Sequence, residues 1–351
     1  MEISQNISLA PFTTFGIGGP ARWFAQAASE DEIVEAAEWA CDRRVPLFVL
    51  GGGSNLLVSD RGFDGLVLRI ALRGLFTDPA QPGLLRAAAG EPWEDCVQRS
   101  LDASWAGFEC LAGIPGAVGG TPVQNVGAYG QEVASVIARV RVFDLAERVF
   151  RELTAAECGF SYRRSRFNTT GRDRFIVTRV DYRLTPGAAP TLRYPELVRA
   201  VEAAHPGATA SLAQVAAIVR RIRQSKGMLL IEGDPDCRSA GSFFKNPSVP
   251  EKLWRAIAAR SAEQVPHFAA EPGTGGEPRV KIPAAWLIEQ AGFAKGHVQG
   301  AAGISSRHTL ALINCGSGTA AELLALRDQI IAAIFARFGI ALEMEPVLLG
   351  F

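Results

Sequence analysis

Residues 238–247 place several reactive groups next to one another. A hydroxyl (Ser242), a cation (Lys245) and a carboxamide (Asn246) stand beside two phenylalanines. Gly241 precedes the serine and permits a close approach of the backbone. Two interpretations fit this pattern equally well. The segment can be a catalytic or binding site, or it can be a turn into a buried strand that the aromatic rings anchor.

Residues 51–55, Gly-Gly-Gly-Ser-Asn, form a second candidate site. They separate two apolar segments, 47–50 and 56–58, which we predict to be strands. A Rossmann or Walker loop would open a helix here, and neither the GxGxxG spacing nor a GK[ST] sequence is present. Unhindered backbone N–H groups in such a loop can bind phosphate oxygens. A three-glycine hairpin fits the same residues.

Two more stretches have compositions that suit ligand binding. Residues 106–130 contain seven glycines and two prolines, and they are too apolar for a disordered segment. They either wrap a large ligand or form a structural connection. Residues 160–167 contain three arginines and a tyrosine, which suit recognition of a carboxylate or phosphate but also fit a solvated charged segment. The cations at 220–226 end a predicted helix, where they are ordinary partners of its dipole.

The composition excludes several classes of protein. The chain has 351 residues, 48% of them hydrophobic, with 36 Lys plus Arg and 36 Asp plus Glu, so no net charge favours nucleic acid or an anionic membrane. No apolar run reaches the roughly 18 residues of a membrane span. The N-terminus lacks the pattern of a signal peptide, and we expect a cytoplasmic protein. The six cysteines are scattered singly without nearby histidine pairs, which argues against zinc. No histidine lies within 25 residues of Cys237, which argues against that cysteine as a nucleophile.

Periodicity and capping signals predict both helices and strands. The expected helices lie at about 30–43, 92–104, 212–225, 251–261, 283–291 and 320–338. The expected strands lie at about 47–50, 56–58, 66–68, 84–89, 136–144, 147–151, 176–184 and 310–314, with a final strand that includes 342–347. This mixture predicts an α+β fold.

Five motifs occur in an order that resembles one protein family. They are residues 51–57, 114–130, the pair Tyr162-Arg163, residues 239–247 and the triplet Glu343-Met344-Glu345. Together they resemble UDP-N-acetylenolpyruvoylglucosamine reductase (UDP-N-acetylmuramate dehydrogenase, the MurB family, type I-like), and the resemblance extends from Thr13 to Gly350. It implies a two-part FAD-binding domain of the vanillyl-alcohol-oxidase (PCMH) type, 1–75 and 76–224. An α+β substrate-binding domain, 225–340, and a C-terminal strand, 341–351, would follow.

The resemblance also implies a reaction and its cofactors. NADPH would reduce a non-covalently bound FAD, and hydride would pass to the enolpyruvyl group of UDP-N-acetylglucosamine enolpyruvate to give UDP-N-acetylmuramate, a peptidoglycan precursor. The implied partners are these small molecules, with no nucleic acid, no membrane insertion and no metal, and we expect a monomer. The residues matched to FAD contacts are Gly51, Gly52, Gly53, Ser54, Asn55, Pro115, Gly116, Gly119, Gly120, Thr121, Gly127 and Arg223. Those matched to the substrate are Tyr162, Tyr194, Lys226, Asn246, Lys281 and His308, where His308 replaces a glutamine of some relatives.

Three residues match catalytic positions of the family. Addition of hydride to the terminal enolpyruvyl carbon leaves an enolate-like anion, which a fixed cation should stabilise. Arg163 is the matched cation, since it is always charged and can bind a carboxylate through two donors. Glu345 is the matched acid that would polarise this anion or order its protonation. Ser242 is the matched proton donor for the adjacent carbon, and Lys281 or a water chain would assist it.

Two other functions compete with this interpretation. The chain could be a different FAD oxidase or dehydrogenase, which would reoxidise rapidly with oxygen and ignore the enolpyruvyl sugar. It could also be a catalytically silent nucleotide-binding module, which would purify without flavin. The joint presence of Arg163, Ser242, Glu345 and Tyr194 argues against the first, and the intact catalytic positions argue against the second.

Overall fold

The computed structural model describes residues 1–351, except for the side chain of Thr274, and divides them into two compact units. The first unit consists of Met1–Ser8, Pro20–Gly53 and Phe63–Ser225. The second unit consists of Leu9–Gly19, Ser54–Gly62 and Lys226–Phe351. The expected subdomain edge at 75 lies inside the first unit. Two short segments of the expected first subdomain belong to the second unit, because Phe15 and Leu57 are buried in its core.

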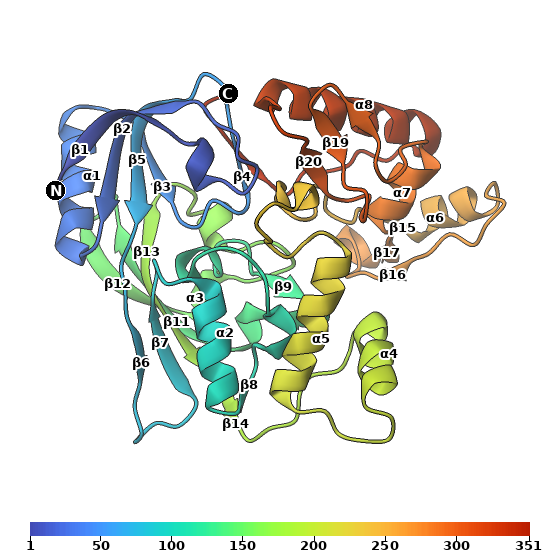
Figure 1. The fold of residues 1–351 in the computed structure, drawn as a ribbon, viewed down its shortest axis with the longest axis horizontal. Coiled ribbons are helices and arrows are strands. Elements are labelled where there is room, and N and C mark those ends of the chain that lie inside the picture. Colours follow the sequence, from blue (N-terminus) through green and yellow to red (C-terminus); the bar gives the residue numbers. More distant parts are fainter. The chain divides into compact units, whose positions relative to one another are not determined.

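The first unit begins with a four-stranded sheet of order β1-β2-β5-β3, labelled in Figure 1. Its strands are β1 (Ile3–Ser8), β2 (Pro20–Ala27), β3 (Leu47–Leu50) and β5 (Phe63–Ile70). Strands β2, β5 and β3 are parallel, so their carboxyl ends meet at one edge of the sheet. Helix α1 (Glu30–Asp42) starts where the Ser29 side chain accepts a hydrogen bond from the Glu32 N–H group.

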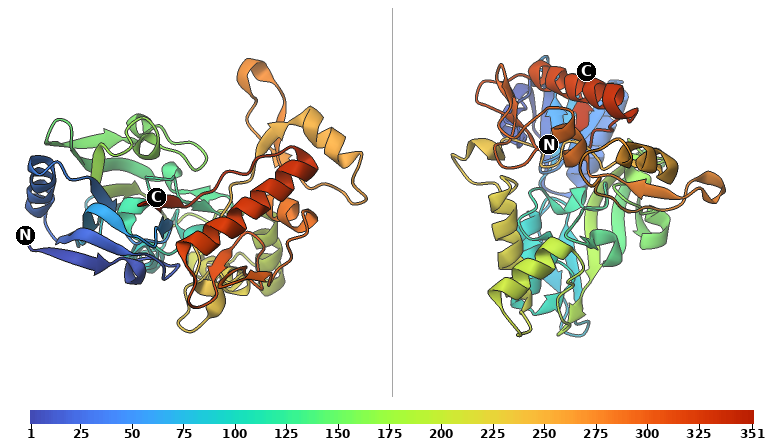
Figure 2. Two further views of the ribbon diagram at one scale, coloured as in Figure 1. Left: turned by 90° about the horizontal axis from the view of Figure 1, so that it is seen from above. Right: turned by 90° about the vertical axis from the view of Figure 1, so that its right-hand side faces the viewer.

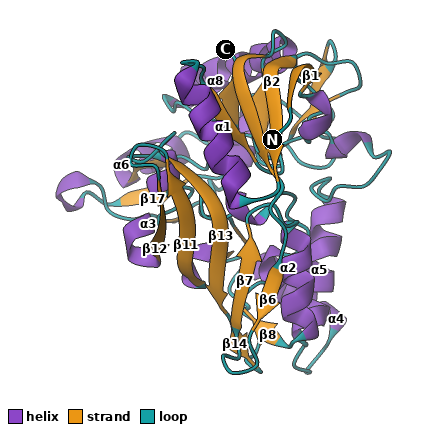
Figure 3. Cartoon of the chain, turned by 90° about the vertical axis from the view of Figure 1, so that its left-hand side faces the viewer, coloured by secondary structure: helices purple, strands orange, loops and turns teal.

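An antiparallel five-stranded sheet of order β12-β11-β13-β7-β6 completes the framework of this unit (Figure 3). The strands are β6 (Leu75–Thr77), β7 (Leu84–Ala88), β11 (Ile137–Asp144), β12 (Val149–Thr154) and β13 (Phe175–Arg183). Two short pairs accompany it, β8 (Trp105–Ala106) with β14 (Thr185–Pro186) and β9 (Gly127–Ala128) with β10 (Gln131–Glu132). The helices are α2 (Trp93–Asp102), α3 (Ala155–Cys158), α4 (Pro195–Ala204) and α5 (Leu212–Ser225).

Glu30, the first residue of α1, connects that helix to the five-stranded sheet. Its carboxylate accepts two hydrogen bonds from Arg141 on β11, at 2.8 and 2.9 Å, and one from Thr178 on β13 at 2.7 Å. The Arg141 guanidinium is the main reason why the pKa of Glu30 lies below its ordinary value. Helix α1 is therefore joined to the five-stranded sheet by a charged, bidentate contact.

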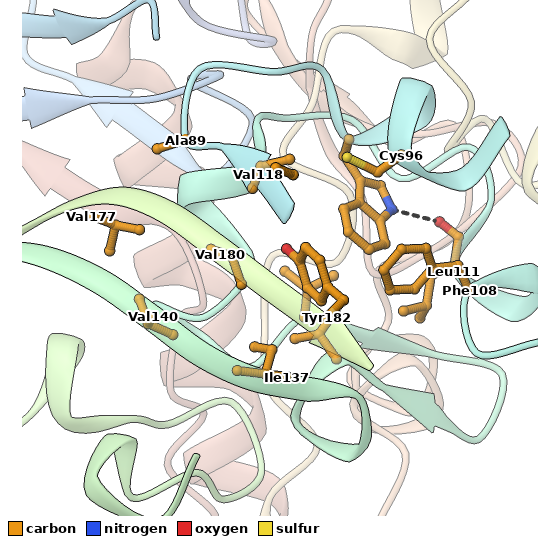
Figure 4. Packing of buried hydrophobic residues seen from close by; sticks show 14 of the residues in the cluster. Ala89, Cys96, Phe108, Leu111, Val118, Ile137, Val140, Val177, Val180 and Tyr182 are labelled. Carbon is orange, nitrogen blue, oxygen red and sulfur yellow. Dashed lines mark hydrogen bonds between the residues drawn. The ribbon is translucent and has the colours of Figure 1, made fainter. Parts of the chain in front are cut away.

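Aromatic side chains, among them Phe108 and Tyr182 in Figure 4, pack together in the core of the first unit. The Trp93 ring lies 4.6 Å from Phe108 and 5.9 Å from Tyr182 in edge-to-face contacts. The Trp93 Nε1–H group donates to the Leu111 carbonyl at 3.1 Å. The fully buried Tyr182 hydroxyl lies 2.7 Å from the hydroxyl of Thr121, which donates to the Val118 carbonyl. Burial raises the pKa of Tyr182 well above its ordinary value, so this hydroxyl stays protonated.

The second unit contains three small sheets. They are β15 (Ser248–Pro250), β17 (Arg279–Lys281) and β16 (Phe268–Ala269); β18 (Val298–Gln299), β19 (Ala302–Ile304) and β20 (Leu312–Asn314); and β4 (Leu56–Val58) with β21 (Val347–Leu349). Its helices are α6 (Glu251–Ala258), α7 (Ala284–Gln290) and α8 (Ala320–Phe338), the long red helix in Figure 2. None of the described helices has the length and apolarity that crossing a membrane requires.

Local signals predicted the helices of both units well. Helix α8 has the expected bounds, with a capping box between Thr319 and Glu322 and a left-handed Gly339 at its end. Strands β1 and β2 were not predicted. The expected final strand was wrong in position, because β21 begins only at Val347. Pro346 has no N–H group to donate to a ladder, and from 342 to 346 only a single bridge, Phe244 with Met344, is formed.

The Tyr182–Thr121 hydroxyl pair gives a test of the core. Replacing Thr121 with Val should reduce the free energy of unfolding by about 1–3 kcal/mol, because the buried Tyr182 hydroxyl loses its partner. Urea unfolding of the two proteins measures the difference. Adding Tyr182→Phe to Thr121→Val should recover most of the loss, since no buried hydroxyl is then left without a partner. A double variant as unstable as the sum of both changes would contradict this account.

Candidate active site

The backbone of Glu345 is hydrogen-bonded on both sides within the second unit. Its N–H group donates to the Phe243 carbonyl at 2.9 Å, and its own carbonyl accepts from the Asn55 side chain at 3.1 Å. The Lys245 N–H group donates to the Glu343 carbonyl at 2.9 Å, so the two segments run antiparallel. This pairing brings together two predicted catalytic positions, because Ser242 directly precedes Phe243.

Ser242 is half-buried and stands on a well-anchored segment. Phe243 and Phe244 behind it are 0% and 1% exposed, and the Phe243 N–H group donates to the Leu310 carbonyl at 2.7 Å. Gly241 in front of it has a φ of +71°, and a Cβ built there would meet nothing within 4 Å. The positive φ therefore explains the glycine, and the space beside it is open. The segment is thus an anchored turn, as one of the two interpretations predicted, and the site interpretation stays a prediction for the half-buried Ser242.

Asn246 has a structural contact of its own. Its Oδ1 atom accepts a hydrogen bond from the Ala284 N–H group at 2.9 Å, which caps the start of α7. The adjacent Pro247 carbonyl accepts from Ile282 at 3.1 Å. Lys281 directly precedes Ile282 and lies on β17, where it pairs with Ser248. A substrate contact of Asn246 would use its Nδ2 group.

An ionic cluster holds together two loops that carry predicted site residues. Arg307 contacts Asp234 at 2.5 Å and Asp236 at 2.9 Å, and Ser306 donates to Asp236 through its N–H group at 2.9 Å and its hydroxyl at 2.8 Å. His308 follows directly, with its N–H group 3.3 Å from Ser305 Oγ. These contacts fix the loop of His308 against residues 234–237, which lead into the Ser242 segment.

The chain enters the second unit for the last time at Lys226, and the next residue packs against the same cluster. A Cβ on Gly227 would lie 2.8 Å from Cβ of Asp236, and the φ of this glycine is +65°. The Lys226 position is thereby held beside the loops of Asp236 and His308. Cys237 donates its thiol to the Leu229 carbonyl at 2.7 Å, and burial raises its pKa. A raised pKa makes this thiol a poorer nucleophile at neutral pH.

Arg163 lies in the first unit, in a sparsely populated conformation. Its φ is +56°, which a non-glycine residue adopts at a cost of about 1–2 kcal/mol. Asn168 Nδ2 donates to its carbonyl at 3.1 Å, and Asn125 Nδ2 donates to the Ser161 carbonyl at 3.1 Å. The Arg163 Nη1 atom lies 3.4 Å from where a Cβ of Gly127 would be. Residues 125–127 therefore set the position of the arginine, and a side chain at 127 would press against it.

Two glycine segments of the first unit meet at the carboxyl edge of its parallel strands. A Cβ on Gly52 would lie 2.5 Å from Cα of Gly116, so only glycine allows this approach of two backbones. Cβ atoms on Gly51 and Gly120 would meet nothing within 4 Å. A cavity of about 450 Å³ opens here, as expected for the carboxyl ends of parallel strands. Its lining includes Gly51, Gly52, Gly90, Gly116, Ala117, Arg69 and Arg73.

Arg69 and Arg73 are two residues of this cavity that sequence reasoning missed. Arg69 Nη1 lies 3.3 Å from Gln26 Oε1, and Arg73 contacts the nearly buried Glu91 at 3.1 Å. Arg69 is the last residue but one of β5, and Arg73 lies three residues after the end of that strand, at the edge where parallel sheets meet ligands. Their position just after the predicted strand at 66–68 was the signal from which the sequence could have indicated them. The cavity thus offers backbone N–H groups and two guanidinium groups, a donor set suited to phosphates.

Several predicted cofactor residues have structural contacts instead of open surfaces. The Thr121 hydroxyl is committed to Tyr182, and Gly119 packs against Ala89, whose Cβ would lie 2.8 Å from a Cβ at 119. Gly53 has a φ of +62°, and the Ser54 carbonyl accepts from Thr14. The boundary between the units falls between these last two residues. Pro115 directly precedes the close contact at Gly116.

Arg223 supports the backbone of the glycine-rich segment. Its Nε–H group donates to the Gly113 carbonyl at 3.0 Å, while the Gly113 N–H group donates to Glu94 at 2.7 Å. Glu94 in turn accepts from Arg220 at 2.7 Å. Arg223 is 9% exposed, and burial lowers its pKa. The Gly113 peptide, at the start of residues 113–130, is therefore fixed from both sides by charged side chains.

Two exposed tyrosines flank these elements. Tyr194 is 36% exposed at the start of α4, and its ring makes an edge-to-face contact with Tyr129 at 5.6 Å. Burial raises the pKa of Tyr129 to about 12. Tyr162 is 38% exposed, with its ring 5.5 Å from Cζ of Arg163. Both Tyr162 and Tyr194 present aromatic surface to solvent on the first unit.

Comparisons with known proteins find relatives of this chain in sequence and in structure. Residues 21–151 match the FAD binding domain model, and residues 234–349 match the model for the C-terminal domain of UDP-N-acetylenolpyruvoylglucosamine reductase. The reductase of Streptomyces coelicolor is 46% identical over 97% of this chain and 89% of its own. That of Thermobifida fusca is 44% identical over 99% and 98%. The crystal structure of the enzyme from Thermus caldophilus, 27% identical, aligns with a TM-score of 0.67 over 99% of both chains.

The contact between the glycine segments predicts an effect on stability. Gly52→Ala should destabilise the protein by about 1–3 kcal/mol, because its Cβ would overlap the backbone at Gly116. Gly51→Ala is the matched control, since its Cβ meets nothing. Thermal unfolding of the flavin-free proteins should show a lower Tm for Gly52→Ala alone. Equal Tm values for the two variants would refute the close approach.

The ionic cluster predicts a pH dependence. The hydrogen bond from Arg307 lowers the pKa of Asp234 below its ordinary value of 3.8. A depressed folded-state pKa contributes stability that is present above pH 3.8 and is lost as the pH falls below it. Asp234→Asn should therefore be clearly less stable than wild type at pH 7, and the difference should shrink below pH 4. Urea unfolding at both pH values measures it, and a difference that grows in acid would contradict the assignment.

Proposed function

The chain belongs to the UDP-N-acetylenolpyruvoylglucosamine reductase family, and on that premise we propose that it is the NADPH-dependent, FAD-containing enzyme that makes UDP-N-acetylmuramate for peptidoglycan synthesis. Its substrates would be NADPH and UDP-N-acetylglucosamine enolpyruvate. We further propose that it acts in the cytoplasm as a monomer. The observation that carries the proposal is the pairing of the Ser242 segment with the Glu345 segment, since it places a hydroxyl and a carboxyl residue at adjacent backbone positions.

The cavity of the first unit fits the dinucleotide part of FAD. Its glycine lining offers backbone N–H groups, a Cβ at Gly52 could not be accommodated, and Arg69 and Arg73 supply positive charge for two phosphates. The peptide of Gly113, fixed by Glu94 and Arg223, would hold the second glycine segment in place for the cofactor. When bound, FAD would accept a hydride from NADPH and deliver it to the terminal enolpyruvyl carbon.

We propose six side chains as contacts for the nucleotide sugar. Tyr194 offers an exposed ring and a hydroxyl for the uridyl diphosphate, and Lys226 offers a point charge. Tyr162, Asn246, Lys281 and His308 are the further proposed contacts. The hydrogen bond that Asn246 Oδ1 accepts at the start of α7 would fix the carboxamide in one orientation, so that its Nδ2 group can donate to the substrate.

Three side chains would then stabilise the negative charge of the intermediate and supply its proton. Arg163 would bind the enolpyruvyl carboxylate and stabilise the negative charge that develops there, and its conformation is set in advance by Asn125, Gly127 and Asn168. Ser242 would give a proton to the carbon next to the carboxylate. Glu345, held beside the Ser242 segment, would polarise the anion or order this protonation.

A two-step anaerobic experiment tests the function. NADPH should bleach the absorbance of the bound flavin, and the enolpyruvyl sugar should then restore it. Protein that purifies without flavin would point to a silent binding module. Reduced flavin that reacts with oxygen but ignores the sugar would point to a different oxidase or dehydrogenase.

The role of Ser242 makes a sharper prediction. Ser242→Ala should leave flavin reduction by NADPH unchanged and slow reoxidation by the enolpyruvyl sugar by about 10²–10⁴-fold, the usual effect of removing a general acid. Stopped-flow absorbance separates the two half-reactions. Ser248→Ala, an exposed serine on β15, is the matched control. Equal reoxidation rates in Ser242→Ala and wild type would exclude Ser242 as the acid.

A further inference from the structure

Asn55 has two contacts with the C-terminal segment, one from its side chain and one from its backbone. Its Nδ2 group donates to the Glu345 carbonyl at 3.1 Å, and its own carbonyl accepts from the Val347 N–H group at 2.9 Å. The residue between these two contacts is Pro346, which has no N–H group. A single asparagine thus holds the chain on both sides of the proline.

The carboxamide takes the place of a backbone donor. Parallel pairing of β21 with β4 starts at Val347 opposite Leu56. In a regular parallel ladder, the carbonyl two residues earlier, that of Glu345, would accept from a backbone N–H group of the partner strand. Here the side chain of Asn55 makes that bond. Asparagine is suited to this because its short side chain carries an amide like that of the backbone.

From these contacts we propose that Asn55 is a positioning residue for Glu345, and that it acts on the proton-transfer step and not on cofactor binding. The inference rests on the proposed function, because it needs Glu345 to take part in the reaction. The other side of the Glu345 backbone is bonded to Phe243, next to Ser242. With both peptide groups fixed, the Glu345 carboxyl can move only by rotation of its own side chain, and Asn55 supplies one of the two fixed points.

This role differs from the phosphate contact that the resemblance suggested for Asn55. A phosphate ligand would change FAD affinity when it is replaced. A residue that acts through Glu345 would change the rate of flavin reoxidation and leave FAD affinity alone. Replacing it would also have no further effect once Glu345 has lost its acid function, because the effects of mutations at two coupled residues are not additive.

Asn55→Asp removes the N–H donor with almost no change of shape, and Glu345→Gln removes the acid. We expect Asn55→Asp to slow reoxidation by the enolpyruvyl sugar by about tenfold, the effect of one lost hydrogen bond. The FAD dissociation constant, measured by flavin fluorescence, should stay within about twofold of wild type. In the Glu345→Gln background, Asn55→Asp should slow reoxidation by less than about twofold.

Two further variants guard against trivial outcomes. Asn6→Asp adds the same charge at an exposed site of the first unit and should leave all rates unchanged. If Asn55→Asp does not fold, Asn55→Gln keeps the carboxamide and should retain the wild-type FAD affinity with a slower reoxidation. A loss of FAD affinity in either Asn55 variant, or an Asn55→Asp effect that is undiminished in Glu345→Gln, would overturn the inference. Failure of the wild type to be reoxidised by the sugar would instead refute the proposed function.

Discussion

The backbone pairing around Glu345 is the interaction on which the second unit depends most. It joins three stretches that lie far apart in the sequence, the strand after the glycine loop, the Ser242 segment and the C-terminus. Strand β21 continues the same contact, because the Ser59 N–H group donates to the Leu349 carbonyl at 2.8 Å. Gly350 then passes so close to Gly62 that a Cβ would lie 1.9 Å from its carbonyl oxygen. Such contacts between distant segments carry a loop-closure cost, and the apolar core around Phe243 and Leu57 offsets it.

Two backbone segments also approach each other closely in the first unit. Gly52 faces Gly116 without side chains between them, and charged residues behind them fix the loops in place. Glu91 contributes twice, since its carboxylate contacts Arg73 and its carbonyl accepts from Val118 at 2.9 Å. If the proposed phosphate site lies in this cavity, these fixed loops would lower the cost of ordering the site on binding.

Sequence reasoning succeeded where the controlling interactions are local. The bounds of α8 follow from Thr319, Glu322 and Gly339, all within the helix or next to it. It failed where a distant partner decides. No residue near Thr121 in the sequence indicates that it will bond to Tyr182, and none near Asn55 indicates its hydrogen bond to Glu345. The misplaced final strand has the same origin, because alternation suggested a strand through Pro346 while the available partner, β4, begins only opposite Val347.

Motif recognition located the candidate residues, and the structure adds how they are held. Hydrogen exchange at the amides of Glu345 and Val347 tests that central claim most directly, because these two N–H groups donate to Phe243 and Asn55. Both amides should be strongly protected from exchange in the native protein. Exchange of the Glu345 amide at the rate of an unstructured peptide would contradict it, since the predicted acid would then stand on a loose tail and not at a fixed junction.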